Sequence, residues 1–276
     1  MHVVEITIPY TSTLETFHFF PLGDIHSGAI ECDEVSIKEK VQDVVKDDHS
    51  YVLGQGDYAD CITKSDPRFD ALNLAGWVEK TNIVESQRAW VKDLFEPLAK
   101  EKRLIALLTG NHEEEIHLRH DNDLVRNLCR DLNVAYAGYT AYIVLRFLRG
   151  VKSEVFIWHA WHGSGAAQSE GARLNRLIRL AGDIEADIYT MGHIHGAITT
   201  YTPDRLYYNK DKRKIDSKKI TASLSGSWVF GYMQTEEDEE HKANPYYGEK
   251  KGYKPARIGC PVIHIRPENR EVWLEV

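Results

Sequence analysis

Five short apolar runs divide the first two thirds of the chain. They are FHFFPL (17–22), SYVLG (50–54), RLIALL (103–108), SEVFIWHAW (153–161) and ADIYTM (186–191). Continuous apolar runs of this length are typical of strands that are buried in a parallel or mixed sheet. The sequence therefore predicts five buried strands, the first of which ends near Leu22.

Between these runs, apolar residues recur every three or four positions, which is the spacing of one helix face. This pattern predicts helices within 32–48, 76–101, 116–133 and 171–185. Strands that alternate with helices in this way indicate an α/β architecture.

The last third of the chain has a different pattern. Residues 196–228 alternate β-forming residues with turn residues, and 260–276 predict a hairpin around PENR at 267–270. Between them, the charged segment near 234–256 predicts a long polar surface loop. Because the chain has no internal repeat and no clear linker, we expect residues 1–276 to form a single domain.

The composition is ordinary for a globular protein, with 42% hydrophobic and 28% charged residues. The N-terminal residues have no basic segment followed by an apolar one, so no signal peptide is expected, and no apolar run approaches membrane-spanning length. The four cysteines are far apart in the sequence, which favours reduced thiols in a cytoplasmic protein over a disulfide framework or a zinc ribbon.

The net charge of −8 argues against broad nucleic-acid binding through a basic surface. It does not exclude a polyanionic substrate, because divalent metals bound in an active site would supply local positive charge. The candidate chemistry of the turns therefore matters more than the overall charge.

Each apolar run is followed by a glycine-flanked turn that carries residue types able to bind metals. These are Asp24 and His26, then Asp57 and Asp60, then Asn111, His112 and Glu113, then His162, and finally His193 and His195. Two histidines two positions apart converge on one centre only on a strand or in a tight loop. Because ligands of open α/β sheets bind beyond the carboxyl ends of the strands, we expect these turns to meet at one edge.

Taken in order, these blocks resemble the calcineurin-like metallophosphoesterase family. The chain carries D-x-H at 24–26, G-D-x-x-D at 56–60, G-N-H-E at 110–113, H-G at 162–163 and G-H-x-H at 192–195. The resemblance extends from about Gly23 to Gly196, with all five blocks in the family's order. It implies a four-layer α/β/β/α sandwich of two mixed β-sheets flanked by helices, with a centre of two metal ions.

The resemblance also implies which residues bind each metal. One metal is assigned to Asp24, His26, Asp57 and His195. The other is assigned to Asp57, Asn111, His162 and His193, so that Asp57 bridges the two ions. This set of oxygen and nitrogen ligands favours Mn²⁺, with Fe, Zn²⁺ or Ni²⁺ as alternatives.

Two such metals can hold and deprotonate a bridging water, and the resulting hydroxide attacks phosphorus in line. His112 follows Asn111 and is not assigned to a metal, so we expect it to protonate the leaving oxygen or to stabilise the transition state. We therefore expect a metal-dependent phosphoesterase whose substrate is a phosphodiester, either a nucleotide or a nucleic acid. A phosphomonoesterase or phosphoprotein phosphatase is the alternative, and a catalytically silent scaffold is a third interpretation.

Several polar residues have structural explanations beside the functional ones. Asp24 and Asp57 can also cap helices, although within the five-block set metal binding is the better interpretation. Asp60 and Glu113 are expected to orient the ligands through hydrogen bonds, or to lie at helix N-termini. Two further sets of residues have two explanations each. His117, Arg119 and His120 either contact substrate or lie on a solvated helix face. Trp228, Tyr246, Tyr247 and Tyr253 either stack on a base or pack a loop.

In the block WHAWHGSG two histidines compete for one ligand position. A strand that continues through Ala160 and Trp161 brings His162 to the edge of the sheet. It leaves His159 about 10 Å back along the strand, at about 3.3 Å per residue. We therefore predict that His162 is the ligand and that His159 is a buried histidine with a hydrogen bond to a neighbour.

Overall fold

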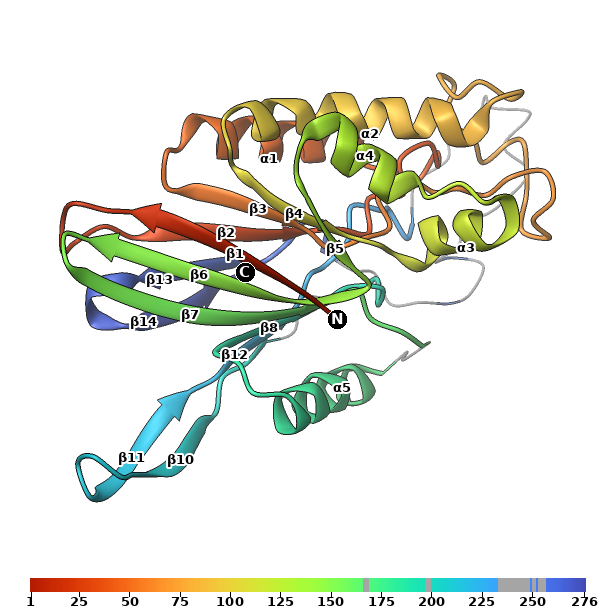
Figure 1. Cartoon of the computed structure of the whole chain (residues 1–276). Coiled ribbons are helices and arrows are strands. Elements are labelled where there is room, and N and C mark those ends of the chain that lie inside the picture. The colour runs from red at the N-terminus through yellow and green to blue at the C-terminus, as the bar shows by residue number, and fades with distance from the viewer. Residues whose placement is uncertain (166–168, 197–199, 233–248, 250–251, 253–256) are drawn as a thin grey trace.

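The chain folds into two mixed β-sheets with helices on their outer faces, as the computed structural model shows (Figure 1). The structure describes residues 1–165, 169–196, 200–232, 249, 252 and 257–276. Within these residues there are two six-stranded sheets, a separate two-stranded ribbon and five α-helices. The predicted α/β class with two mixed sheets is confirmed.

Sheet I has the strand order β14–β13–β2–β3–β4–β5. Its strands are β2 (Phe17–Leu22), β3 (Ser50–Gly54), β4 (Leu104–Leu108), β5 (Ala135–Gly138), β13 (Val262–Arg266) and β14 (Glu271–Glu275). Strands β2 to β5 are parallel, and the β13–β14 hairpin is added antiparallel to β2. This hairpin turns through the 3-10 helix Pro267–Asn269, which confirms the predicted turn at PENR.

Sheet II has the strand order β1–β6–β7–β8–β12–β9. Its strands are β1 (His2–Pro9), β6 (Thr140–Arg149), β7 (Lys152–Trp161), β8 (Ile188–Met191), β9 (Thr200–Tyr201) and β12 (Thr221–Leu224). Strand β1 is parallel to β6, β7 is antiparallel to β6, and β8 and β12 continue parallel to β7. The N-terminal strand thus joins the sheet built from the second half of the chain, whereas the C-terminal hairpin joins the sheet built from the first half.

Three apolar cores hold these layers together. The helices α1 (Glu34–Lys46), α2 (Ile83–Lys100) and α4 (Leu124–Leu132) pack on the outer face of sheet I. A second core fills the space between the two sheets, with Phe19, Phe147 and Trp158 among its fully buried side chains. The helix α5 (Glu170–Asp183) packs its Leu177 and Ala181 against the outer face of sheet II.

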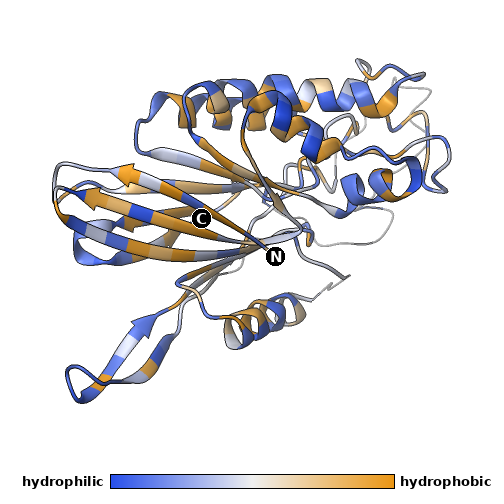
Figure 2. Ribbon diagram, viewed as in Figure 1, coloured by the Kyte–Doolittle hydropathy of each residue, from blue (hydrophilic) through white to orange (hydrophobic). Residues whose placement is uncertain are grey.

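The helices alternate hydrophobic and hydrophilic residues, in keeping with one buried and one exposed face (Figure 2). In α1, for example, Ile37, Val41 and Val44 are buried, and the Asp33 side chain caps the N-terminus by accepting from the Ser36 N–H. Burial of a regular apolar stripe and a capped first turn explain why this segment is helical.

Two of the predicted helices differ from their expected bounds. The segment 76–101 becomes helical only at Ile83, because residues 76–82 form turns before the Asn82 cap. The segment 116–133 is divided between α3 (Asn111–His120) and α4. The break occurs at Asp121, which has a left-handed backbone with φ of 52° and therefore ends α3.

The sequence pattern also missed three strands, β1, β5 and β6. Five strands were predicted from continuous apolar runs, and none of these five runs lies in the three missed strands. Strand β6 alternates half-buried and buried residues from Thr140 to Leu148, which is the pattern of a strand whose two faces have different surroundings. The loop predicted near 234–256 lies outside the described residues except for 249 and 252.

All four cysteines are free thiols, as predicted. Among the described residues, no helix combines the length and apolar character that crossing a membrane requires.

Candidate metal centre

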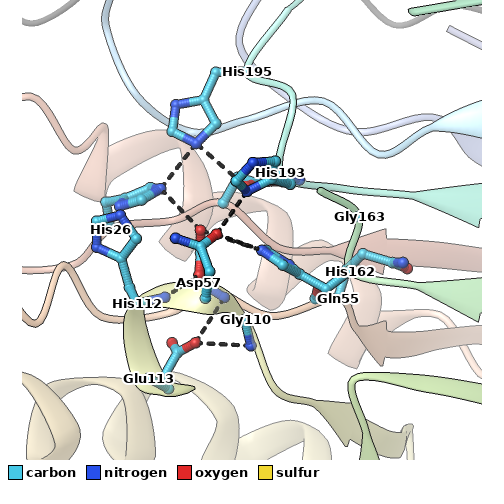
Figure 3. A network of polar contacts seen from close by, with 12 residues as sticks. His26, Gln55, Asp57, Gly110, His112, Glu113, His162, Gly163, His193 and His195 are labelled. Atoms are coloured by element: carbon cyan, nitrogen blue, oxygen red, sulfur yellow. Dashed lines mark hydrogen bonds and ion pairs between the residues drawn. The ribbon is translucent and has the colours of Figure 1, made fainter. Parts of the chain in front are cut away.

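The turns that follow β2, β3, β4, β7 and β8 meet at one edge of the two sheets (Figure 3). This edge brings together all seven side chains that the resemblance assigns to metals, namely Asp24, His26, Asp57, Asn111, His162, His193 and His195. Sheet I supplies the first four and sheet II supplies the three histidines that follow β7 and β8. The site therefore lies between the two sheets and needs both of them.

One group of four residues consists of Asp24, His26, Asp57 and His195, whose donor atoms lie within 4.8 Å of one another. The Nε2 atoms of His26 and His195 are 2.9 Å apart. His195 Nε2 lies 3.3 Å from Asp24 Oδ1, and His26 Nε2 lies 3.8 Å from Asp57 Oδ2. Four ligand atoms thus face one small volume.

A second group, Asp57, His162 and His193, shares the Asp57 carboxylate with the first. His162 Nε2 lies 3.3 Å from Asp57 Oδ2 and 3.1 Å from Asn111 Oδ1. The Asn111 oxygen is also 2.6 Å from His193 Nδ1. Asp57 therefore lies between the two groups, the position that the resemblance implies for a bridging ligand.

The chemistry of these donors fits a divalent metal ion. Asp24, Asp57 and His162 are at most 1% exposed, so their polar atoms have lost their hydration. Burial alone would raise the pKa of Asp57, but the neighbouring histidines, His162 first, hold it well below its usual range. Buried carboxylate charge needs cationic partners, and mixed nitrogen and oxygen donors without thiolates suit first-row transition metals.

The backbone at this edge is held in an unusual conformation. Asp24, His26, Asp57 and His193 have φ values of 49°, 49°, 52° and 67°, in the left-handed region. Such a conformation costs a non-glycine residue about 1–3 kcal/mol and occurs most often at functional sites. Four of the seven candidate ligands share it, so the surrounding fold must hold these turns in place.

Two glycines of the sequence blocks are required by close contacts. A Cβ atom at Gly110 would lie 2.1 Å from Asp57 Oδ1 and 2.2 Å from the Asp57 nitrogen. At Gly56, where φ is +91°, a Cβ atom would lie 2.6 Å from His162 Nδ1. A side chain at either position would displace a candidate ligand, which explains why G-D and G-N occur at these strand ends.

Hydrogen bonds direct the imidazole rings toward the centre. His162 Nδ1 lies 2.8 Å from the Gln55 carbonyl, to which it donates, so that Nε2 faces Asp57 and Asn111. His26 Nδ1 lies 3.4 Å from Asp60 Oδ1, which leaves its Nε2 facing His195. Such partners fix the tautomer and orientation of metal-binding histidines. This is one of the two roles expected for Asp60.

Glu113 supports the turn from below, which is the first role expected for it. Its carboxylate accepts the backbone N–H groups of Asp57, Tyr58, Ala59 and Gly110 at 2.6–3.2 Å. Burial, followed by the charge of Asp57, raises the pKa of Glu113 to about 7, whereas its four N–H donors favour the ionised form. A single buried carboxylate thus joins the turns after β3 and β4.

Gln55 is a polar residue of the site that the sequence analysis missed. Its fully buried side chain donates to the Trp161 carbonyl at 2.7 Å and accepts from the Thr190 hydroxyl at 3.0 Å. Thr190 in turn accepts from the Trp158 indole N–H at 2.8 Å. These bonds join sheet I to sheet II beneath the centre. A polar residue between two glycines at the end of a buried strand was the signal in the sequence.

His112 is held beside both groups of ligands. Its backbone N–H donates to Asp57 Oδ1 at 3.0 Å, and its Nδ1 contacts the Asp60 carbonyl. Its ring packs edge-on against that of His26, with the ring centres 4.5 Å apart. Burial alone would lower the pKa of His112, but the Asp57 and Asp60 carboxylates raise it. The Nδ1 contact leaves Nε2 as the ring nitrogen available to a substrate.

The two histidines of WHAWHGSG have different environments. Strand β7 continues through Trp161, as predicted, and His162 follows it directly into the centre. His159 is buried farther back, where its Nε2 lies 3.1 Å from the Thr140 hydroxyl and its ring packs against Tyr142. The structure brings only His162 to the other candidate ligands, and metal binding by His162 remains a prediction.

The remaining candidates are not part of the centre. His117, Arg119 and His120 are exposed on α3, where Arg119 forms an ion pair with Glu115. Trp228 is only 2% exposed and belongs to the core between sheet I and the helices on its outer face. Stacking of its side chain on a base is therefore excluded in this conformation. Three tyrosines lie outside the described residues; they are Tyr246, Tyr247 and Tyr253.

No model of a known protein family matches this chain, and no curated protein matches it. The geometry of the centre and the resemblance of its five blocks are what point to a function.

Proposed function

We propose that this protein is a two-metal phosphoester hydrolase of the calcineurin-like type, with the four-layer α/β/β/α fold of that family. The observation that carries the proposal is the convergence of six aspartate, asparagine and histidine side chains around Asp57 at the edge between two sheets. The order of the five sequence blocks supports the same conclusion.

In this proposal Asp24, His26, Asp57 and His195 hold one ion, and Asp57, Asn111, His162 and His193 hold the other. When bound, two divalent ions would lower the pKa of a bound water, and their positive charge would stabilise negative charge on the phosphoryl oxygens. The donor set favours Mn²⁺, with Fe, Zn²⁺ and Ni²⁺ as the alternatives.

The residues of the chain have separate tasks in this reaction. Asp57 provides the negative charge common to both ions, and Glu113 and Gly110 keep its turn in position. His112 holds a proton at Nε2 and gives it to the leaving oxygen, while its Nδ1 is fixed by the Asp60 carbonyl.

The preferred substrate is a phosphodiester, a nucleotide or a nucleic acid, in a protein that works in the cytoplasm. A phosphomonoester or phosphoprotein is the second candidate, because the metals and His112 can act on both ester types. A silent scaffold is the third, and the filled set of ligand positions argues against it.

The test is hydrolysis of bis-p-nitrophenyl phosphate and of p-nitrophenyl phosphate with Mn²⁺, Fe²⁺, Zn²⁺ or Ni²⁺. We expect metal-dependent hydrolysis of the diester and at most weaker hydrolysis of the monoester. The reverse preference would favour the phosphatase, and hydrolysis of neither with any metal would favour the scaffold. His159→Gln is a matched control, since it replaces a buried histidine outside the centre and should retain activity.

A further inference from the structure

The ribbon of β10 (Asp204–Asn209) and β11 (Lys214–Lys219) belongs to neither sheet and projects from the body of the protein (Figure 1). Its base is attached to the body by polar contacts. Lys218 forms an ion pair of 2.9 Å with Asp187, and Arg205 donates to the Ala181 carbonyl. Among the described residues, the side-chain hydrogen bonds and ion pairs of its outer part stay within the ribbon.

The ribbon lies at the end of sheet II away from the candidate centre. Strand β12 is parallel to β8 and begins beside Ile188, and β11 ends two residues before β12. His193 and His195 follow the opposite end of β8. Four residues of β8 and six of the ribbon, at about 3.3 Å each, place the tip on the order of 30 Å from the centre.

The charge of the ribbon is opposite to that of the rest of the chain. Residues 204–219 contain seven lysines and arginines and three aspartates, a net charge of +4, which leaves −12 for the remainder of a chain of net −8. Within the described part of the chain, Lys210, Arg213, Lys214 and Lys219 have no acidic partner. By contrast, Lys212 is paired with Asp216 at 3.2 Å.

One face of the ribbon is apolar and exposed. The register pairs Tyr208 with Ile215 and Leu206 with Ser217, so these side chains point to the same side. Leu206, Tyr208 and Ile215 are 70%, 61% and 72% exposed. Figure 2 shows hydrophobic positions among the mostly hydrophilic residues of this ribbon. Lys210 and Arg213 lie in the turn at the tip, and Lys214, which pairs with Asn209, lies on the face opposite to Tyr208. Non-specific binding of single-stranded nucleic acid combines cations for the backbone with exposed aromatic side chains for the bases.

We propose that the ribbon is a docking arm for a single-stranded polynucleotide, with Lys210, Arg213 and Lys214 on the phosphates and Tyr208 stacked on a base. The inference rests on the proposed function, because it selects a polynucleotide among the phosphodiester substrates. It reconciles the acidic chain with a polyanionic substrate, since the binding charge is concentrated on one projecting element. Two ribbons of net +4 would repel each other in a symmetric ribbon-to-ribbon dimer, which argues against a second copy as the occupant.

The test measures binding of a fluorescent single-stranded 30-mer in buffer with a chelator, so that no metal or turnover is involved. The triple variant Lys210→Ala, Arg213→Ala, Lys214→Ala should bind about tenfold or more weakly. It should also reduce the salt slope by about 2, at about 0.7 per lost phosphate contact. Tyr208→Ser should weaken binding by about 5- to 150-fold.

The matched control removes three charges elsewhere. Lys38→Ala, Lys46→Ala, Lys100→Ala takes ion-paired lysines from α1 and α2 and should bind like the unmodified protein. Hydrolysis of bis-p-nitrophenyl phosphate should be unchanged in the ribbon variants, because this small diester does not extend to the ribbon. If the unmodified protein does not hydrolyse bis-p-nitrophenyl phosphate, the proposed function is refuted, whereas the result of the binding measurement still stands. Equal binding by the ribbon and control variants, or a change from dimer to monomer on sedimentation of the ribbon variant, would overturn the docking arm.

Discussion

Among the described residues, two pairs of histidines have ring nitrogens within hydrogen-bond distance, and they lie near opposite ends of β2. His26 and His195 meet at 2.9 Å beyond the end of the strand, and His18 meets His264 at 2.7 Å near its beginning. In each pair one histidine is buried and the other is half-buried, so proximity and burial do not distinguish the pairs.

The surroundings of the two pairs differ. Around His26 and His195, two aspartates offer further ligand atoms to the same volume, and three of these four residues are buried. At the other pair both Nδ1 atoms face each other, and Glu275 contacts the far nitrogen of His264 at 3.1 Å. At the first pair, histidine and aspartate ligand atoms converge on one volume. At the second pair, the two histidines are joined by a hydrogen bond. Backbone conformation separates them as well, because left-handed residues occur at the first pair and His18 and His264 lie in regular strands.

The largest expected effect comes from the residue common to both ligand groups. Asp57→Asn keeps the shape of the side chain and removes its negative charge, so metal content should fall at both sites. Activity should fall by more than the about 10- to 100-fold typical of residues that only orient a ligand. Metal analysis of the purified variant checks this prediction, and near-full occupancy at both sites would contradict the assignment.

His112→Ala should retain the metals and slow turnover by about 10²- to 10⁴-fold, because His112 is assigned to proton donation. Esters with good leaving groups need less protonation and should lose less activity than alkyl esters. Rates for a series of leaving groups provide the measurement. An equal loss across the series would leave His112 with charge stabilisation alone.

The two histidines at the end of β7 give an intermediate effect. His162→Ala should lower metal occupancy at the second site only. His159→Ala should retain the metals and destabilise the fold by about 1–3 kcal/mol, since it removes a buried side chain. Burial lowers the pKa of His159 to about 4, so its contribution to stability is present above pH 6.5 and is lost as the pH falls toward 4. Denaturant unfolding at pH 7 and pH 5 measures this pH-dependent contribution to stability. Loss of metal from the His159→Ala variant would mean that His159, and not His162, is the ligand.

The smallest effect is expected at the pair that does not converge. Burial, and then the charge of His264, lowers the pKa of His18, although Asp47 opposes this. Because the unfolded chain takes up the proton more readily, stability should fall as the pH drops below about 6.5. His18→Gln should reduce this dependence and change stability by no more than the about 1 kcal/mol of one hydrogen bond. Loss of bound metal from this variant would erase the distinction between the two pairs.

The sequence predicted the turns that form the centre better than the contacts that hold it. Buried strands that end in Gly-Asp or Gly-Asn-His are visible as apolar runs followed by polar turns, and β2, β3, β4, β7 and β8 follow these runs. The left-handed backbone of Asp24 and His26 was not predictable, because both residue types adopt ordinary conformations elsewhere. The role of Gln55 depends on Thr190, which is 135 positions away, and no local pattern reports such a contact.

The same limit applied to the last third of the chain. Alternating β-forming residues between 196 and 228 predicted strands, and the described residues of this segment form four of them, β9 to β12. Strands β10 and β11 do not belong to sheet II. Whether a strand joins a sheet depends on the partners available at the edge of that sheet, and these partners cannot be predicted from the local sequence.

The exchange of terminal strands between the two sheets has a consequence for dividing the protein. A cut between β5 and β6 would leave the first fragment without the hairpin that borders β2, and the second without the strand that borders β6. Each fragment would carry the missing strand of the other, so the two should assemble when they are mixed. The chain is thus suited to fragment complementation, in which the candidate metal centre would be complete only when both pieces are present.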